Sequence, residues 1–376
     1  MKRFVFFCLI AVISAALVPA QSRVPELSGV FDSTVNYTAG DSHSWGIEEY
    51  ANLRLRVRPS NKLAFNAAFN VIAVSGNYLQ SPGWSQIFGN ENYAANLELE
   101  RLFFRINGEH IDTEAGLLRM GFGYGNIWGP SDFINPRSPL SYNARPRGVL
   151  GVNFTWYPAD SLKLMVFGAA PKNAQDSGGG GIIPGFSLDQ HWDRASLQVL
   201  YGYQTQLAGS PWGIHRFGLS VKADLGPGFA ADALYTFNPD NPDDIEGLSA
   251  SAGFDYSFLG GDLYFLTEYL FNGFSSSTAF SHDNIAGRRN HHYLSGTILY
   301  RFNDYCSAAL STAFCFDDLS FSPSLSLDYD IFQGFSMNLS VRVPLDQKIL
   351  SGGTPGEFGP AMGARVITNA GVKLRF

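Results

Sequence analysis

The stretch ARVITNAGVKLRF, residues 364–376, ends the chain and alternates in character from one residue to the next. In a β-strand, successive side chains point to opposite faces, so the stretch predicts a strand with two unlike faces. The apolar face carries Val366, Thr368, Ala370, Val372, Leu374 and Phe376. The other face carries Arg365, Ile367, Asn369, Gly371, Lys373 and Arg375. One face suits lipid and the other suits water, and the last residue belongs to the lipid face.

The same two-residue period recurs along the whole chain, for example in residues 48–58, 216–225, 248–258 and 319–330. We count about 17 such segments of about ten residues each, the length that a strand of an outer-membrane barrel needs. If both chain ends lie in the periplasm, the number of strands must be even, so the prediction is 16 or 18 strands. The uncertain region is 171–215, where a short strand is expected to be hidden.

The connections between these segments alternate between tight and long, as in outer-membrane barrels. The tight ones include 59–61, 158–160, 226–228, 259–261 and 303–304. The long ones include 75–93, 123–146, 171–193, 273–290 and 345–362. In residues 95–107 the apolar phase shifts at Glu100 and Arg101, which predicts a β-bulge at that point.

The start of the chain predicts a secretory signal peptide over residues 1–20. Lys2 and Arg3 precede an apolar core, Phe4 to Leu17, that is short for a membrane helix, and small residues follow before Gln21. Residues 21–376 would then form a single barrel with long extracellular loops, in the outer membrane of a bacterium. A net charge of −7 argues against a nucleic-acid partner.

A soluble β-sandwich or β-solenoid would also show alternation. Neither would require so many strands of nearly uniform length, nor aromatic residues beside the tight turns on the apolar face, where a membrane-interface girdle belongs. These aromatic residues are Trp156, Phe258, Phe302, Tyr329 and Phe376. The fold class expected is therefore all-β, a transmembrane antiparallel up-and-down β-barrel.

The terminal strand NAGVKLRF resembles the C-terminal signal of bacterial outer-membrane proteins. That resemblance implies that Phe376 is recognised by the barrel-assembly machinery. Phe376 could equally serve only to close the aromatic girdle, and the two roles are compatible.

The water-facing side of the predicted strands carries an uneven distribution of charge. Early strands place basic residues inside the barrel: Arg54, Arg56, Arg58, Arg101, Arg105, Arg119, Arg147 and Lys163, opposed by Glu98 and Glu100. Later strands place acidic residues inside: Asp232, Asp255, Asp262, Glu268, Asp328 and Asp330. Such charges can select ions and orient polar solutes. Alternatively they pair across strands and only solvate the wall.

Residues 123–148, GYGNIWGPSDFINPRSPLSYNARPRG, form the richest of the long connections. With the preceding strand they resemble a motif of alginate-export-type porin-like barrels, through Arg119, Trp128, Gly129, Pro130, Asp132, Asn135 and Pro136. Prolines stiffen the loop, so we expect it to fold into the lumen and to hold Asp132, Arg137, Arg145 and Arg147 at a constriction. The alternative is an ordered extracellular cap.

Enzyme motifs are missing from the sequence, and the pairs His291–His292 and Asp317–Asp318 are weak evidence for a catalytic site. Cys306 and Cys315 are too far apart along one strand to pair, and no metal site or cofactor is expected. The favoured function is a porin-like channel for passive diffusion of small hydrophilic, charged solutes. Alternatives are a hydrophobic-compound transporter, for which no N-terminal plug is evident, and a structural or adhesive surface barrel. Expected partners are outer-membrane lipid, the assembly machinery and small solutes, with a homo-oligomer left open.

Overall fold

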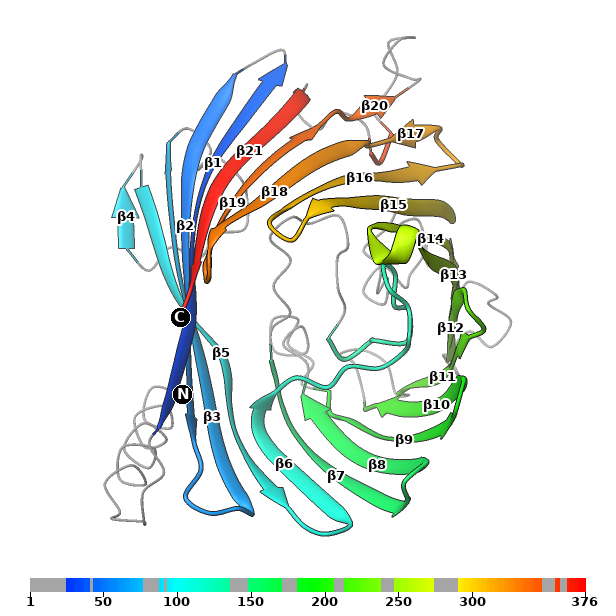
Figure 1. Ribbon diagram of the computed structural model, residues 1–376. Coiled ribbons are helices and arrows are strands. Elements are labelled where there is room, and N and C mark those ends of the chain that lie inside the picture. The colour runs from blue at the N-terminus through cyan, green and yellow to red at the C-terminus, as the bar shows by residue number, and fades with distance from the viewer. Residues whose placement is uncertain are drawn as a thin grey trace.

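The computed structural model describes residues 25–40, 43–76, 88–90, 93–135, 148–170, 181–205, 213–237, 247–273, 290–346, 356–358 and 364–376. Within these residues, eighteen antiparallel strands form one closed barrel (Figure 1). Eighteen is one of the two strand numbers that the alternation and the parity of the chain ends predict. No helix in the described ranges is long and apolar enough to cross a membrane.

The strands of the barrel wall pair with their neighbours in chain order. They are β1 (Glu26–Gly40), β2 (Ser44–Val57), β3 (Leu63–Gly76), β5 (Tyr93–Asn107), β6 (Ile111–Leu118), β7 (Val149–Ala159), β8 (Leu162–Ala170), β9 (Ile183–Trp192), β10 (Ala195–Gln204), β11 (Ile214–Asp224), β12 (Gly228–Phe237), β13 (Leu248–Phe258), β14 (Leu263–Asn272), β15 (His292–Asn303), β16 (Cys306–Cys315), β18 (Ser324–Phe332), β19 (Phe335–Arg342) and β21 (Ala364–Arg375). Three short strands extend the rim: β4 (Phe88–Asn90), β17 (Ser320–Phe321) and β20 (Leu345–Asp346).

The barrel closes between its first and last strands, which run side by side in Figure 1. Strand β1 pairs with β2 on one side and with β21 on the other, with Val30 opposite Arg375 and Phe31 opposite Leu374. Among the described strands, closure leaves no wall strand with a free edge, which is what a sheet in lipid requires, because an unpaired N–H or C=O is costly there.

The structure contains the predicted β-bulge in β5 and the predicted hidden strand, β9. The predicted bulge lies at Glu100: Ala68 of β3 faces Arg101, the next residue Phe69 faces Leu99, and Glu100 is the extra residue. The hidden strand in 171–215 is β9, so the prediction of one long connection over 171–193 is wrong for its second part. Pro184 and Gly185 near the start of β9 are typical of a loop, and they hid a strand whose outer face carries Phe186, Leu188 and Trp192.

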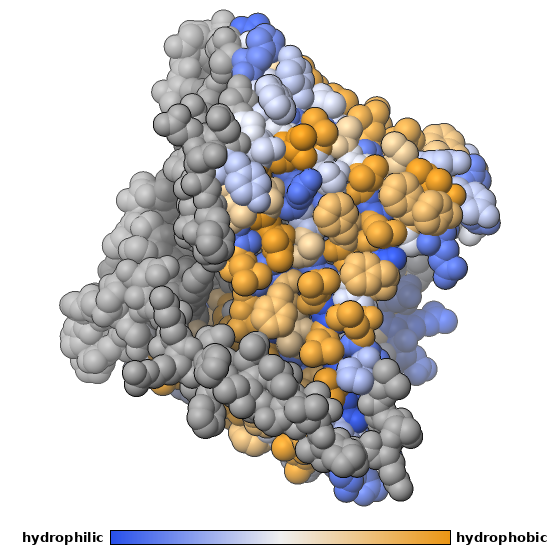
Figure 2. All heavy atoms as spheres, turned by 90° about the vertical axis from the view of Figure 1, so that its left-hand side faces the viewer, coloured by the Kyte–Doolittle hydropathy of each residue, from blue (hydrophilic) through white to orange (hydrophobic). Residues whose placement is uncertain are grey.

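The two faces of the wall have the character that the sequence predicts. Leu53, Phe217 and Val221 point outward and are exposed, whereas Asn52 and Ser220, their chain neighbours or near neighbours, point inward. Figure 2 shows apolar side chains gathered across the middle of the outer face, with polar residues toward its ends. All five predicted girdle residues are exposed, with 44–58% of each residue's surface accessible.

The inner face departs from simple alternation on one side of the barrel. Leu200, Leu234 and Leu270 are fully buried, although their strand neighbours Val199, Tyr235 and Tyr269 face outward and are exposed. In a single-layer barrel, a fully buried strand residue must lie on the inside under another part of the chain. The interior of β8–β16 therefore contains an apolar core.

Candidate pore and the segment inside it

After β6 the chain turns into the barrel instead of continuing to the rim. Residues 119–135, which we call the inward segment, cross the interior toward β12–β14 (Figure 1). The described part of the predicted inward loop thus lies in the lumen. Residues 136–147 of that loop lie outside the described residues.

Glu268 of β14 holds the middle of the inward segment. Its Oε2 accepts hydrogen bonds from the backbone N–H groups of Asn126 and Ile127, both at 2.9 Å, and its Oε1 accepts one from Trp128 at 3.1 Å. The Trp128 indole Nε1 also donates to the Glu268 carbonyl at 3.2 Å. One carboxylate, only 1% exposed, thereby satisfies three successive peptide donors, the arrangement that offsets the cost of burying its charge.

Asp232 of β12 does the same for the preceding residues. Its Oδ1 accepts from the Tyr124 N–H at 2.9 Å and its Oδ2 from the Gly125 N–H at 2.8 Å. Gln198 of β10 accepts from the Gly123 N–H at 2.7 Å. Gly123 has φ of +85°, and an added Cβ there would lie 2.5 Å from Asp232 Oδ2, so only glycine fits this close approach.

Apolar side chains of the inward segment fill the core described above. Phe122, Phe133 and Ile134 pack in one cluster with inward residues of β7–β12. Trp128 packs in a second cluster, with ring centroids 5.8 Å from Tyr293. The two clusters flank the carboxylates of Asp232 and Glu268, so apolar burial and hydrogen bonds fix the same stretch of backbone.

The far end of the inward segment is also attached to this side of the barrel. Ser131 donates to the Ala233 carbonyl at 3.3 Å and accepts from the Ser220 hydroxyl at 3.2 Å. Asn135 accepts from the Met120 N–H at 2.9 Å, which joins the two ends of the segment. Asp132, a predicted constriction residue, is only 3% exposed, so its carboxyl group is covered and does not face an open lumen.

The wall formed by β1, β2, β3 and β5 carries the predicted arginine row. Strand register places Arg54 opposite Ala68, and Ala68 opposite Arg101, so these three residues form one row across the wall. The next row is Arg56, Asn66 and Phe103. A pocket of about 260 Å³ opens over these rows and is also lined by Glu26, Ser28 and Glu100.

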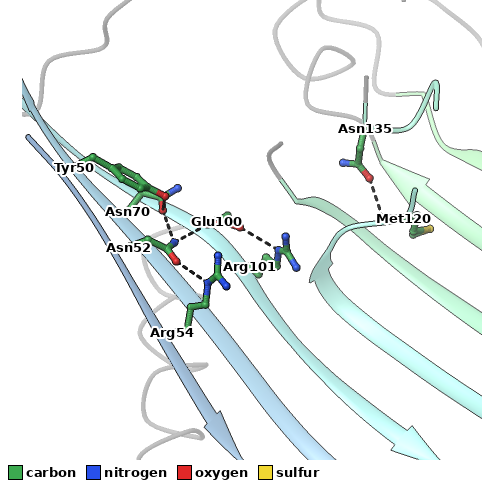
Figure 3. A network of polar contacts seen from close by, with 8 residues as sticks. All are labelled: Tyr50, Asn52, Arg54, Asn70, Glu100, Arg101, Met120 and Asn135. Carbon is green, nitrogen blue, oxygen red and sulfur yellow. Dashed lines mark hydrogen bonds and ion pairs between the residues drawn. The ribbon is translucent and has the colours of Figure 1, made fainter. Parts of the chain in front are cut away.

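A network of polar contacts backs this pocket (Figure 3). The Asn52 side-chain amide donates to Asn70 at 2.6 Å and to Glu100 at 2.8 Å, and Asn52 Oδ1 accepts from Arg54 Nε at 2.6 Å. Glu100 also lies 3.2 Å from Arg101 Nε. The bulge at Glu100 makes this possible, because it lets two consecutive residues, Glu100 and Arg101, contribute to the same inward surface.

The arginines differ in their pairing. Arg58 lies 3.7 Å from Glu26, and Arg105 lies 2.6 Å from Glu114. Within the described part of the chain, neither Arg54 nor Arg56 has a carboxylate within salt-bridge distance. The Arg56 Nε is buried and has no hydrogen-bond acceptor among these residues. Arg54 and Arg56 therefore form a positively charged patch on this wall.

Four other arginines that the sequence predicts at the constriction are not among the described residues that line this pocket: Arg119, Arg137, Arg145 and Arg147. Arg119 is half-buried at the start of the inward segment and does not line the pocket. Arg137, Arg145 and Arg147 lie outside the described residues. The strand alternation correctly predicts that Asp232 and Glu268 lie inside the barrel, but it does not predict that they accept hydrogen bonds from backbone N–H groups. It also does not predict that Phe103 lines the pocket.

A separate cluster at the rim anchors residues 356–358. Asp318 accepts hydrogen bonds from the Asn290 side chain at 2.8 Å and from the Glu357 N–H at 2.7 Å. Burial opposes ionisation of Asp318, but bonds from Ser320 and the Glu357 N–H hold its pKa below its usual value. Within the described chain, no group of acidic, histidine or cysteine side chains is arranged to hold a metal ion.

The two sequence pairs that resemble a catalytic dyad do not form one. Asp317 accepts hydrogen bonds from the backbone N–H groups of His291 and His292, at 2.9 and 2.8 Å. The imidazoles are bonded elsewhere: His291 Nδ1 to the Asn272 carbonyl and His292 Nδ1 to the Tyr269 hydroxyl. Cys306 and Cys315, on one strand, are free thiols.

No protein-family model matches the sequence, and no curated protein matches it. Solved structures of outer-membrane barrels do match its fold. Wzi of Escherichia coli, described as an outer-membrane protein involved in group 1 capsule assembly and as a carbohydrate-binding β-barrel, has a TM-score of 0.61 at 11% identity, over 98% of this chain and 88% of that chain.

Two further structures extend this similarity. OccAB4 of Acinetobacter baumannii has a TM-score of 0.58 at 12% identity, over 95% of this chain and 99% of that chain. A variant of the porin of Rh. blastica has a TM-score of 0.51 at 13% identity, over 94% of this chain and 100% of that chain. At these identities the similarity shows the fold, a closed outer-membrane-type β-barrel, and no more.

Proposed function

We propose that the protein is a porin-like channel of the bacterial outer membrane, for passive diffusion of small hydrophilic, charged solutes. The observation that carries this proposal is the asymmetry of the interior. One wall is covered by the inward segment, and the opposite part of the interior carries Arg54 and Arg56 without carboxylate partners among the described residues. Similarity of fold to a porin supports the same class of function.

The charge distribution gives the channel a preferred solute. Guanidinium groups on a wall of low dielectric attract anions into the lumen, and the attraction is stronger where no carboxylate neutralises them. The acidic residues Asp232 and Glu268 of the opposite wall add little negative charge to the open side, because both are buried and accept hydrogen bonds from the backbone of the inward segment. Small anions are therefore the solutes that this interior favours.

Reconstitution into planar lipid bilayers tests the proposal. The purified protein should form channels, and the reversal potential in a salt gradient should show anion selectivity. The double variant Arg54→Gln/Arg56→Gln should shift the reversal potential toward cations, whereas Arg301→Gln, at an exposed position near a β15 end, should leave it nearly unchanged. Complete absence of conductance would favour a closed structural or adhesive barrel instead.

Several finer assignments form part of the proposal. Residues 1–20 act as a cleaved signal peptide, and Phe376 is recognised by the barrel-assembly machinery. The motif around Arg119, Trp128 and Asp132 relates the channel to the alginate-export type. The matched motif residues that the structure describes lie in or beside the inward segment, which supports a role for the motif in shaping the lumen. A homo-oligomer in the membrane is compatible with this function.

A further inference from the structure

A second stretch of backbone is held by acceptor side chains at the rim that carries β17 and β20 (Figure 1). Residues 356–358, which we call the rim tripeptide, donate three successive N–H groups to three buried side chains of β17, β20 and the turn before β17. Asp232 and Glu268 hold the inward segment in the same way. The pairs at the rim are Gly356 with Asp346, Glu357 with Asp318 at 2.7 Å, and Phe358 with Ser320 Oγ at 2.9 Å.

Phe358 places an aromatic side chain of the rim tripeptide in the second apolar cluster of the interior. Phe358 is 6% exposed and packs against Tyr293, with ring centroids 5.7 Å apart. Tyr293 is fully buried and packs in turn against Trp128 of the inward segment, with ring centroids 5.8 Å apart. One tyrosine of β15 therefore contacts an aromatic side chain from each of two segments that are far apart in sequence.

The Tyr293 hydroxyl is also bonded to the rim. It donates to Glu357 Oε2 at 2.5 Å and accepts from the Asn290 N–H at 2.6 Å. The Asn290 side-chain amide donates to Asp318 at 2.8 Å and to Glu357 at 3.3 Å. A buried hydroxyl that loses its partner costs free energy, so Tyr293 depends on the rim tripeptide for both its packing and its hydrogen bonding.

Packing transmits a change at the rim to the inward segment. Withdrawal of Phe358 would leave a void beside Tyr293, and a protein interior relaxes only partly around such a void. The Tyr293 ring would then be free to move, and Trp128 would lose the surface against which it packs. Trp128 is also held by the Glu268 carbonyl, which accepts the indole hydrogen bond, so the loss would weaken the attachment of the inward segment without removing its polar anchor.

We propose that Tyr293 couples the rim tripeptide to the inward segment, so that contacts at the rim control how firmly the lumen is filled. Displacement of the rim tripeptide raises the fraction of time for which Trp128 is detached. Coupling free energies are reciprocal, so loosening of Trp128 must loosen the rim tripeptide by the same factor. The coupling needs only the folded barrel, whereas its effect on pore size rests on the proposed channel function.

Hydrogen–deuterium exchange on the full barrel in detergent measures this coupling without requiring conduction, because amide exchange reports local opening. Phe358→Ala should speed exchange of the 126–128 amides by about tenfold, a size common for residues that share a packed partner. Phe316→Ala, which removes a 47% exposed residue's ring directly after β16, is the control and should leave these amides unchanged. Far-UV circular dichroism and heat-modifiable migration confirm that each variant is a folded barrel.

The reverse experiment tests reciprocity. Trp128→Ala should speed exchange of the rim tripeptide's amides by about the same factor of ten. Tyr293→Phe keeps the ring and removes the bond to Glu357, so it should loosen the rim tripeptide and affect the 126–128 amides much less. If Phe358→Ala leaves the 126–128 amides unchanged, or Trp128→Ala leaves the rim tripeptide unchanged, the two segments are independent and the proposal is wrong.

Single-channel recording separates this proposal from the channel function. Phe358→Ala should raise mean conductance and open-channel noise, and Phe316→Ala should change neither. Coupled exchange in a barrel that shows no conductance would remove the channel function and leave the coupling in place. Anion-selective conductance without coupled exchange would remove the coupling and leave the channel in place.

Discussion

The ring of Phe376 lies over Gly29 at the seam where the first and last strands of the barrel meet. The Gly29 N–H donates to the Phe376 carbonyl at 2.8 Å, and the Phe376 N–H donates to the Gly29 carbonyl at 3.1 Å. A Cβ at position 29 would lie only 2.6 Å from Phe376 Cζ. The seam therefore needs glycine at 29 because an aromatic ring occupies the space of a side chain.

Replacing Gly29 with Val should displace the Phe376 ring and weaken closure of the barrel. We expect a loss of about 1–3 kcal/mol, the usual effect of forcing extra methyl groups into a packed contact, measured by urea unfolding of the refolded barrel. Gly168→Val is the matched control, since an added Cβ there meets only Val152 Cγ1 at 3.9 Å. Equal stability of both variants would mean that the ring is free to move away from the seam.

Deletion of Phe376 separates closure from recognition during assembly. If the assembly machinery reads the terminal aromatic residue, the deletion should lower the amount of barrel in the outer membrane and impair refolding of purified protein in detergent much less. Quantitative immunoblotting of membrane fractions, beside refolding yields, measures both. Normal membrane levels of the deletion variant would restrict Phe376 to the girdle.

Substitution with arginine tests which face each strand residue occupies. Leu53→Arg or Val221→Arg would place a charge in lipid and should cost about 2–4 kcal/mol near the membrane midplane. A lumen-facing control must lie on the open part of the wall. Sequence alone offers Ser220 and Ser251, but they are only 1% and 4% exposed, and Ser220 bonds to Ser131 of the inward segment.

Ser326, half-buried on β18, is the better control, because arginine there can extend into the lumen. Folding yield in detergent should fall for Leu53→Arg and Val221→Arg and stay near normal for Ser326→Arg. Comparable losses in both groups would contradict the assignment of faces.

The sequence predicts the wall of this barrel far better than its contents. Alternation depends on neighbours two residues apart, so it revealed the faces, the closed barrel and even the bulge at Glu100. The anchors of the inward segment join residues far apart in the chain, such as Trp128 and Glu268, and no local period reports such contacts.

The same limit explains why the apolar part of the inner wall could not be located from sequence. Leu200, Leu234 and Leu270 point inward, where the inward segment covers them; the sequence predicts a loop folded into the lumen but not which strands it covers. Asp232 and Glu268 could be placed inside the barrel from their phase alone. Their partners are peptide N–H groups, which every residue but proline carries, so sequence gives no signal for the pairing.

The hydrogen bonds to Glu268 hold the inward segment in the lumen and should therefore control the size of the pore. A carboxylate that accepts three peptide N–H groups stabilises the inward segment through its charge, since hydrogen bonds to charged groups are worth about 1.5–3 kcal/mol and neutral ones about 0.5–1.5 kcal/mol. Glu268→Gln keeps the size and one acceptor oxygen but removes the charge, and its amide group places N–H donors opposite the segment's own donors. The segment should then detach transiently, and single-channel recordings should show larger open-channel noise and a higher mean conductance.

Two further variants locate the effect. Trp128→Ala removes the apolar anchor and the indole hydrogen bond, so combined with Glu268→Gln it should raise conductance more than either change alone. Deletion of 129–143 should also raise conductance, because it removes residues 129–135, which lie in the lumen. Glu109→Gln, at an exposed position in the turn after β5, is the charge-matched control and should leave both conductance and noise unchanged. If all three changes in the segment and its anchor leave conductance at the wild-type value, the inward segment lies beside the conduction path, and the narrowest part of the pore is formed elsewhere.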